Sequence, residues 1–128
     1  MKKILFVDDD LLIRTITTNI LDRSPYRVKT AADGFEAIQL LKSEAFDLVI
    51  TDVDMPKMNG SELLNYIQNH YPNLDVIAIS GSVTLTSEQL NGFYLFVSKP
   101  VMDFEALINQ YFEQSKPLDD DQSIARSI

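Results

Sequence analysis

Near its N-terminus the chain reads Ile4-Leu5-Phe6-Val7-Asp8-Asp9-Asp10, four apolar residues followed directly by three aspartates. Uninterrupted apolarity is typical of a strand buried on both faces, as the strands of a parallel sheet are. A second apolar run ends in Thr51-Asp52, and later runs end in Ser80 and in Ser98-Lys99-Pro100. Because the carboxyl ends of parallel strands meet at one edge of the sheet, we expect these polar residues to lie together.

Segments of helical periodicity separate the apolar runs. The strands are expected at Ile4–Val7, Tyr26–Ala31, Phe46–Thr51, Val76–Ser80 and Phe93–Val97. The helices are expected at Leu12–Arg23, with Ile13, Ile16 and Ile20 on one face, and at Gly34–Glu44, Ser61–Tyr71 and Asp103–Gln114. Between the last two strands only Thr86–Asn91 has a helical pattern, barely more than one turn.

This alternation predicts an α/β fold of one doubly wound, five-stranded parallel sheet with the flavodoxin-like order 2-1-3-4-5 and a short or degenerate fourth helix. Residues 1–115 are expected to form the domain. Residues 116–128 have no apolar period and include Asp119-Asp120-Asp121, so we expect a flexible tail or truncated linker there.

Composition excludes several classes of protein. The 128 residues include no cysteine, so disulfides and thiolate metal sites are absent. A net charge of −8 disfavours direct nucleic acid binding, which needs a basic face. No apolar stretch approaches the roughly 20 residues that span a bilayer. A cytoplasmic location and no membrane contact are therefore expected.

The polar strand ends suggest a metal site. Asp8, Asp9 and Asp52 come from two adjacent strands, and their carboxylates would repel one another unless neutralised. A Mg²⁺ ion would neutralise them, because it binds a few carboxylate oxygens and retains several water molecules as its other ligands. Lys99 and Ser80 would add a positive charge and a hydroxyl for phosphoryl oxygens. Each residue alone has an ordinary explanation, such as Asp10 capping a helix; together they favour a phosphoryl site.

The segments quoted above, in this order, resemble the receiver domains of response regulators (CheY-like) in two-component signal transduction. The resemblance also includes Asp47 to Gly60, Val76 to Gly81 and Phe96 to Pro100, and covers about residues 1–115. It implies a phosphoacceptor domain, with Asp52 as the acceptor of a phosphoryl group. Such a domain catalyses its own phosphorylation and slow dephosphorylation and does not turn over small substrates.

The resemblance assigns further roles. Asp8, Asp9, Asp52 and the backbone carbonyl of Asp54 would hold Mg²⁺, and Lys99 would contact the phosphoryl group. Ser80 and Phe96 would form the conformational switch, and the bond before Pro100 is a candidate cis peptide. The implied partners are a sensor histidine kinase or histidine phosphotransfer protein as donor, and an effector protein or an output domain outside this chain. A homodimer is possible in such a family.

Some positions depart from the family pattern. The interval from Ser80 to Lys99 is a few residues shorter than the resemblance leads us to expect, which puts the usual dimer geometry in doubt. Val101 follows Pro100 where an aromatic residue is common. Asp54 and Ser82 occupy positions that tune the lifetime of the phosphoryl group in the family, and the sign of their effect here stays open.

Three alternatives remain at this stage. Asp52-Val53-Asp54 resembles the nucleophile and acid–base pair of haloacid-dehalogenase-like phosphatases, although that motif would leave Asp8 and Asp9 without a role. A flavin or nucleotide module of the same fold is disfavoured, because none of the four glycines follows the first strand and no G-x-G-x-x-G is present. The third alternative is a receiver that is not phosphorylated and serves only for interaction.

Overall fold

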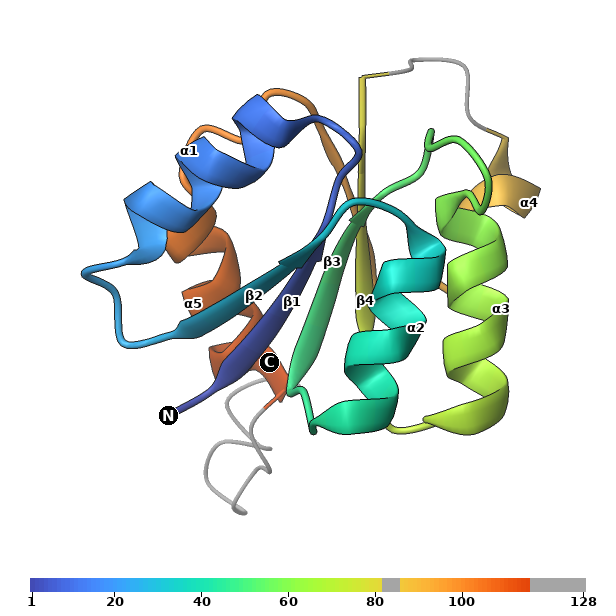
Figure 1. Ribbon diagram of the computed structural model, residues 1–128, viewed down its shortest axis with the longest axis horizontal. Coiled ribbons are helices and arrows are strands. Elements are labelled where there is room, and N and C mark those ends of the chain that lie inside the picture. Colours follow the sequence, from blue (N-terminus) through green and yellow to red (C-terminus); the bar gives the residue numbers. More distant parts are fainter. Residues whose placement is uncertain (82–85, 116–128) are drawn as a thin grey trace, which may run out of the picture.

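The computed structural model describes residues 1–81 and 86–115 of the chain. The described residues alternate between strands and helices along the whole chain (Figure 1). The elements are β1 (Lys3–Val7), α1 (Leu11–Leu21), β2 (Arg27–Ala31), α2 (Gly34–Ser43), β3 (Leu48–Asp52), α3 (Gly60–His70), β4 (Val76–Ser80), α4 (Ser87–Leu90), β5 (Leu95–Ser98) and α5 (Phe104–Ser115). The expected tail at 116–128 and Ser82 lie outside the described residues.

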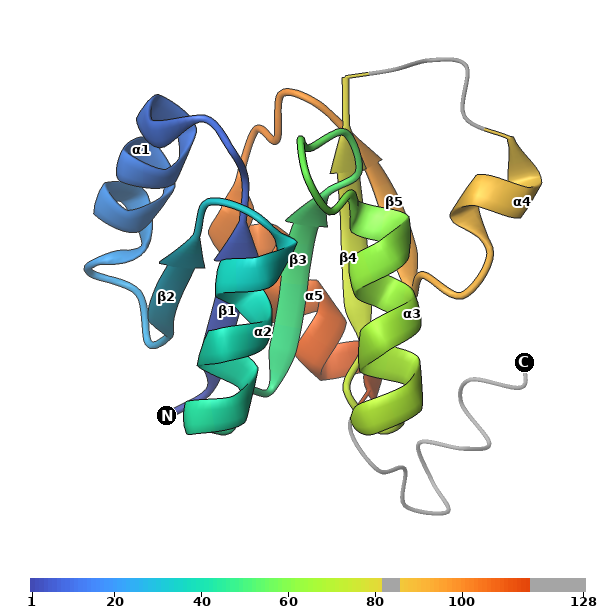
Figure 2. The same ribbon diagram turned by 45° about the vertical axis from the view of Figure 1, so that its right-hand side comes forward.

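The strands form one parallel sheet in the order β2-β1-β3-β4-β5 (Figure 2), as predicted. Each pairing runs to the carboxyl end of the strands: Val7 pairs with Thr51, Asp52 with Ile79, and Ser80 with Ser98. This register brings the polar ends of β1, β3, β4 and β5 to the same edge.

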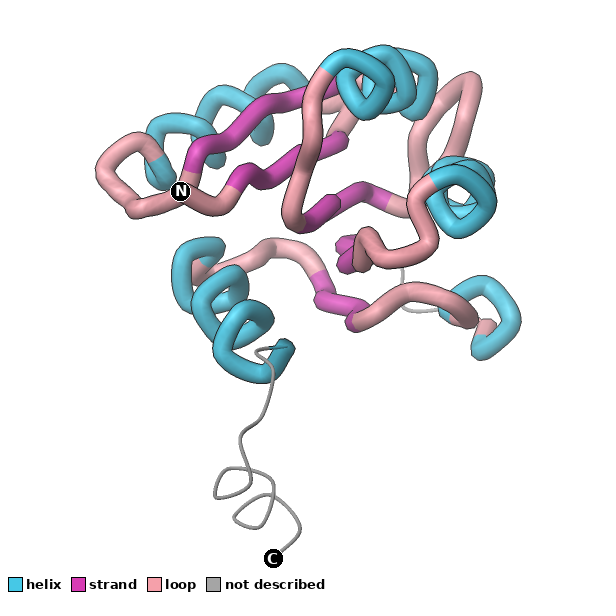
Figure 3. The backbone as a smooth tube through the Cα atoms, turned by 90° about the horizontal axis from the view of Figure 1, so that it is seen from below, coloured by secondary structure: helices cyan, strands magenta, loops and turns pink. Residues whose placement is uncertain are grey.

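Alternate residues of the central strands enter two separate cores. Ile4 and Phe6 of β1 pack against α1 and α5, whereas Leu5 and Val7 pack against α2 and α3. The sheet therefore has helices on both faces (Figure 3), which explains why these strands read as continuous apolar runs. Ile4, Leu5 and Val7 are completely inaccessible to solvent.

Short polar caps fix where the helices begin. The side chain of Asp10 accepts a hydrogen bond from the backbone N–H of Leu12 at the start of α1, so the cap expected for Asp10 is present. At α3, Asn59 and Glu62 form a reciprocal capping box. Because the Asp10 cap directly follows Asp8-Asp9, these two residues are held between β1 and α1.

Two helices differ in how far they follow the expected pattern. The helix α4 has only four residues, as predicted. On α1 the inner positions are Thr17 and Leu21, both buried, whereas Ile16 and Ile20 are 44% and 53% exposed. The apolar face predicted for α1 is therefore only partly buried.

None of the helices in the described ranges has the length and apolarity required to cross a membrane.

Candidate functional site

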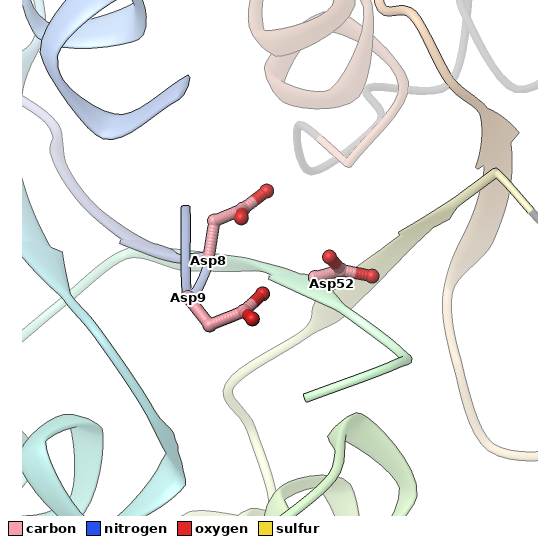
Figure 4. A group of neighbouring side chains, drawn as sticks. All are labelled: Asp8, Asp9 and Asp52. Atoms are coloured by element: carbon pink, nitrogen blue, oxygen red, sulfur yellow. The ribbon is translucent and has the colours of Figure 1, made fainter. Parts of the chain in front are cut away.

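Three carboxylates gather beyond the ends of β1 and β3. Oxygens of Asp8, Asp9 and Asp52 lie within 4.8 Å of one another (Figure 4). Asp8 and Asp52 are buried, with 0% and 4% of their surface exposed, and Asp9 faces solvent. Two buried carboxylates and one open carboxylate at the edge of the sheet form a cluster that solvent can reach from one side.

The start of α1 holds Asp8 in place. Its Oδ1 accepts a hydrogen bond of 2.9 Å from the backbone N–H of Asp10. The guanidinium Nη1 of Arg14 donates to the backbone carbonyl of Asp8 at 2.6 Å. The β1–α1 connection is thereby tied to the first turns of the helix, and the Asp8 carboxylate has little freedom to turn away.

Asp52 is fixed from two sides. Its Oδ1 accepts a hydrogen bond of 3.1 Å from the backbone N–H of Asp54, and its Oδ2 accepts one of 2.6 Å from Lys99 Nζ. The hydroxyl of Thr51 donates to the backbone carbonyl of Asp52 at 3.0 Å. The carboxylate is therefore oriented by the backbone of Asp54 and by Lys99, while Thr51 holds the backbone of Asp52.

Lys99 neutralises part of the acidic charge. Besides Asp52, its Nζ lies 3.2 Å from Oδ2 of Asp8. Burial acts to lower the pKa of Lys99, but the hydrogen bond and charge of Asp52 and the charge of Asp8 outweigh it, so the pKa lies above its ordinary value. Lys99 is thus held in its charged form between the two buried carboxylates.

The same environment also raises the pKa of Asp52, which for a carboxyl group favours the neutral form. Burial raises the pKa of the Asp52 carboxyl, and the negative charge of Asp8 adds to this effect. The hydrogen bonds from Lys99 and from the Asp54 backbone oppose the shift, but the pKa remains above its ordinary value. Lys99 and the Asp54 backbone therefore do not fully offset the cost of burying the charged Asp52 carboxylate.

One oxygen of Asp8 takes part in an ion pair but receives no hydrogen bond. Oδ2 of Asp8 is buried and, despite its ion-pair distance to Lys99, receives no hydrogen bond from any described group. Buried oxygens normally have a partner. Mg²⁺ bonds oxygen at 2.0–2.1 Å, which puts neighbouring ligands about 3 Å and opposite ligands about 4 Å apart. The three aspartates fit such an ion after small adjustments.

The remaining predicted residues lie around this cluster. Ser80 is fully buried at the end of β4, and its Oγ donates a hydrogen bond of 3.1 Å to Oδ2 of Asp54. Phe96 is half-buried on β5, opposite Ala78. The Lys99–Pro100 peptide bond is cis, as expected.

Two contacts of the site had no signal in the sequence. Arg14 reads as one polar residue of an amphipathic helix, and nothing in its spacing indicates that it binds the carbonyl of Asp8. For Asp54, a carbonyl ligand and an effect on the lifetime of the phosphoryl group were expected, but not the contact of its side chain with Ser80. Both contacts join a side chain of a helix or strand to a residue in the loop after β1 or β3, and residue patterns do not specify such directions.

A partly apolar groove adjoins Lys99. It has a volume of about 390 Å³ and lies between α1 and the connection from β5 to α5. Its lining comprises Ile13, Ile16, Thr17, Ile20, Ile79, Lys99, Pro100, Val101 and Phe104. Around it Leu11, Leu12 and Met102 are also strongly exposed. Exposed apolar residues gathered beside a polar site are typical of a protein interaction surface.

Comparison with protein families gives a match over most of the chain. The model of the response regulator receiver domain matches residues 4–111. The receiver is similar in sequence to a part of the CAI-1 autoinducer sensor kinase/phosphatase CqsS of Vibrio cholerae, at 36% identity over 85% of this chain and 17% of the relative. The transcriptional regulatory protein GlrR of Escherichia coli is 35% identical over 93% of this chain and 28% of the relative. The chain thus spans less than a third of the length of these two curated relatives.

Solved structures agree with this match. The response regulator TrrA of Thermotoga maritima, solved in complex with Mg²⁺ and BeF, has a TM-score of 0.78 at 29% identity, covering 88% of this chain and 98% of the other. The chemotaxis response regulator CheY4 of Vibrio cholerae has a TM-score of 0.77 at 29% identity, over 88% and 98% of the two chains.

Proposed function

Because the chain belongs to the response regulator receiver domain family, we propose that Asp52 is the residue on which it accepts a phosphoryl group. The observation that carries this assignment is the hydrogen bond between Asp52 and Lys99, which pairs a buried strand-end carboxylate with a cation. Asp8 is also buried, but Lys99 Nζ lies farther from its Oδ2, at 3.2 Å, and makes no hydrogen bond with it. Asp9 lacks burial. Asp52 therefore combines burial, a fixed orientation and a neighbouring cation.

The chemistry assigned to the residues is a single displacement at phosphorus. An Asp52 carboxylate oxygen attacks the phosphorus of a phosphohistidine, the bond from phosphorus to the imidazole nitrogen breaks, and its electron pair returns to the ring. Lys99, held charged by its neighbours, faces the negative oxygens of the transferring group. Ser80 donates its hydroxyl hydrogen to one of these oxygens once the group is attached, and Phe96 moves with it.

We assign a Mg²⁺ ion to the site of Asp8, Asp9, Asp52 and the backbone carbonyl of Asp54. Two observations support this assignment: Asp8 Oδ2 is buried and receives no hydrogen bond from the described residues, and the three carboxylates lie close together. When bound, Mg²⁺ would supply positive charge to the phosphoryl oxygens. The role of Asp8 and Asp9 is to hold that charge beside Asp52.

The donor is proposed to be a histidine kinase or histidine phosphotransfer protein that docks on α1. A donor must bring its phosphohistidine to Asp52, and the exposed Ile16 and Ile20 line a groove that reaches Lys99. Replacing both isoleucines with serine should slow transfer from a phosphorylated phosphotransfer domain at least tenfold, because apolar contact is lost. The reaction with acetyl phosphate should stay unchanged, and an equal loss with both donors would contradict docking at this groove.

We also propose that the receiver domain comprises residues 1–115 and that its output passes through an effector protein or another domain. The family match ends at residue 111 and α5 ends at Ser115. Removal of residues 116–128 should therefore leave the free energy of unfolding and the phosphorylation rate unchanged. A large loss of either would extend the domain beyond Ser115.

The assignment of Asp52 is tested by intact mass spectrometry after incubation with acetyl phosphate and Mg²⁺. One phosphoryl group should be added to the wild-type protein, and none to the Asp52→Ala variant or in the presence of EDTA. The variant Asp22→Asn, which also removes one carboxylate but lies at the far end of α1, should be phosphorylated normally. Addition of a phosphoryl group to Asp52→Ala would contradict the assignment of Asp52 as the acceptor. Catalytic turnover of phosphate monoesters would instead support the phosphatase alternative, which the family match does not favour.

A further inference from the structure

The side chain of Asp54 has a contact that the proposed phosphoryl transfer does not use. Oγ of Ser80 donates a hydrogen bond of 3.1 Å to Oδ2 of Asp54. Ser80 is completely buried, whereas Asp54 is exposed to solvent. An ionised carboxylate can only accept hydrogen bonds, and a serine hydroxyl has a single hydrogen to donate. In this structure that hydrogen is directed to Asp54.

The single hydrogen of the Ser80 hydroxyl can be donated to one acceptor at a time. Ser80 therefore has to exchange one acceptor for another if it is to donate to a phosphoryl group on Asp52. We propose that Asp54 is a positioning residue that retains the hydroxyl of Ser80 in the unphosphorylated protein and so competes with the phosphoryl group for it. This inference rests on the proposed role of Asp52 as phosphoacceptor.

The local geometry suits such a competition. The backbone N–H of Asp54 donates to Oδ1 of Asp52 at 3.1 Å, so the competing carboxylate is anchored to the residue that is modified. When Ser80 leaves, water can take its place at the exposed Asp54 carboxylate, whereas no solvent reaches Ser80 itself. Breaking the hydrogen bond between Ser80 and Asp54 therefore has a moderate cost. We expect its loss to tighten phosphoryl binding about tenfold, which corresponds to about 1.4 kcal/mol.

A simple charge effect of Asp54 has to be separated from this competition. A negative side chain beside Asp52 repels a phosphoryl group whether or not it binds Ser80. Charge repulsion predicts the same effect of removing Asp54 in the presence and in the absence of the Ser80 hydroxyl. Retention of Ser80 predicts that the effect depends on that hydroxyl, so a double-mutant cycle distinguishes them.

The cycle compares the wild-type protein, Asp54→Ala, Ser80→Ala and the double variant. The dissociation constant for beryllofluoride, a stable phosphoryl mimic, is measured by NMR titration at a Mg²⁺ concentration that saturates all four proteins. Asp54→Ala should tighten binding about tenfold when Ser80 is present and by clearly less in the Ser80→Ala background. Asp22→Asn serves as the matched control and should leave binding unchanged. Equal effects of Asp54→Ala in both backgrounds would overturn the proposal.

A second measurement needs neither metal nor phosphoryl group. The three-bond couplings between Hα and the two Hβ of Ser80 report its χ1 rotamer in the free protein. A single rotamer is expected in wild type and in Asp22→Asn, and a redistribution in Asp54→Ala; unchanged couplings in Asp54→Ala would refute retention by Asp54. If wild type fails to bind beryllofluoride, the proposed function of Asp52 falls, while these couplings still decide whether Asp54 holds Ser80.

Discussion

Lys99 and Asp52 are joined by a hydrogen bond of 2.6 Å, although Asp52 ends β3, Lys99 follows β5, and β4 separates these two strands in the sheet. The lysine reaches across the end of β4 to the carboxylate of β3 and also approaches Asp8 of β1. It supplies positive charge at the place where a divalent cation would neutralise the same carboxylates. Lys99 and Mg²⁺ therefore share one set of negative charges.

Replacing Lys99 with methionine should separate metal binding from phosphoryl transfer. Mg²⁺ should bind more tightly, because a competing cation has been removed from Asp8 and Asp52. Phosphorylation by acetyl phosphate should fall by about 100-fold, the usual effect of losing one group that stabilises transition-state charge. Calorimetry measures the affinity for Mg²⁺, and the rate at which the intact mass increases measures phosphorylation. Lys29→Met, on the exposed face of β2, should change neither; weaker Mg²⁺ binding in Lys99→Met would contradict the shared-charge interpretation.

Mg²⁺ should stabilise the folded protein, because the unfolded chain does not bring Asp8, Asp9 and Asp52 together. At 100 times its dissociation constant the ion should raise the free energy of unfolding by about 2.7 kcal/mol. Urea denaturation with and without Mg²⁺ measures this increment. Asp8→Asn and Asp9→Asn should each greatly reduce the increment, and Asp22→Asn should retain it. An increment that survives in Asp8→Asn would place the metal elsewhere.

The sequence specified the fold well because its pattern is set by burial. Apolar residues on both faces of β1, β3 and β4 require helices on both sides of the sheet, so the layers could be predicted. The strand order was predicted from the flavodoxin-like arrangement of small doubly wound sheets. The position of the site followed from the same reasoning, since parallel strands bring Asp8, Asp52 and Lys99 to one edge.

Other features depended on packing that no residue pattern encodes. The inner face of α1 runs through Ile13, Thr17 and Leu21 at helical spacing. A buried threonine is not distinguishable by hydropathy from an exposed one, so the neighbouring Ile16 and Ile20 looked equally suited to the core. The Asp54–Ser80 contact likewise depends on the path of the chain after β3.

Neutralising Asp52 should make the protein more stable while abolishing phosphorylation. Burial raises the pKa of Asp52 above its value in the unfolded chain, so the folded state binds the proton more tightly and the contribution of Asp52 to stability falls as pH rises. In EDTA at pH 7, Asp52→Asn should gain about 1 kcal/mol over wild type. The gain should shrink as the pH falls toward the ordinary carboxyl pKa. Urea denaturation of both proteins at pH 7 and near the ordinary carboxyl pKa measures this gain. A loss of stability in Asp52→Asn at pH 7 would contradict a destabilising burial of the Asp52 charge.

Gly60 is expected to be required for the geometry of Asp52. A Cβ atom on Gly60 would lie 2.6 Å from the backbone oxygen of Asp52 and 2.8 Å from Cα of Val53, and backbone atoms cannot turn aside as a side chain can. The backbone N–H of Gly60 also donates to the carbonyl of Val53 at 2.9 Å, which keeps the two segments in close contact. Gly60→Ala should therefore push β3 and α3 apart, cost about 1–3 kcal/mol of stability, and slow phosphorylation because Asp52 moves relative to Lys99. Gly81→Ala is the matched control, since among the described residues a Cβ there meets no atom within 4 Å, and its stability should stay at or slightly above that of wild type. Denaturation and acetyl phosphate kinetics on the two variants provide the comparison; equal stability and equal rates would show that the close approach of Gly60 does not position Asp52.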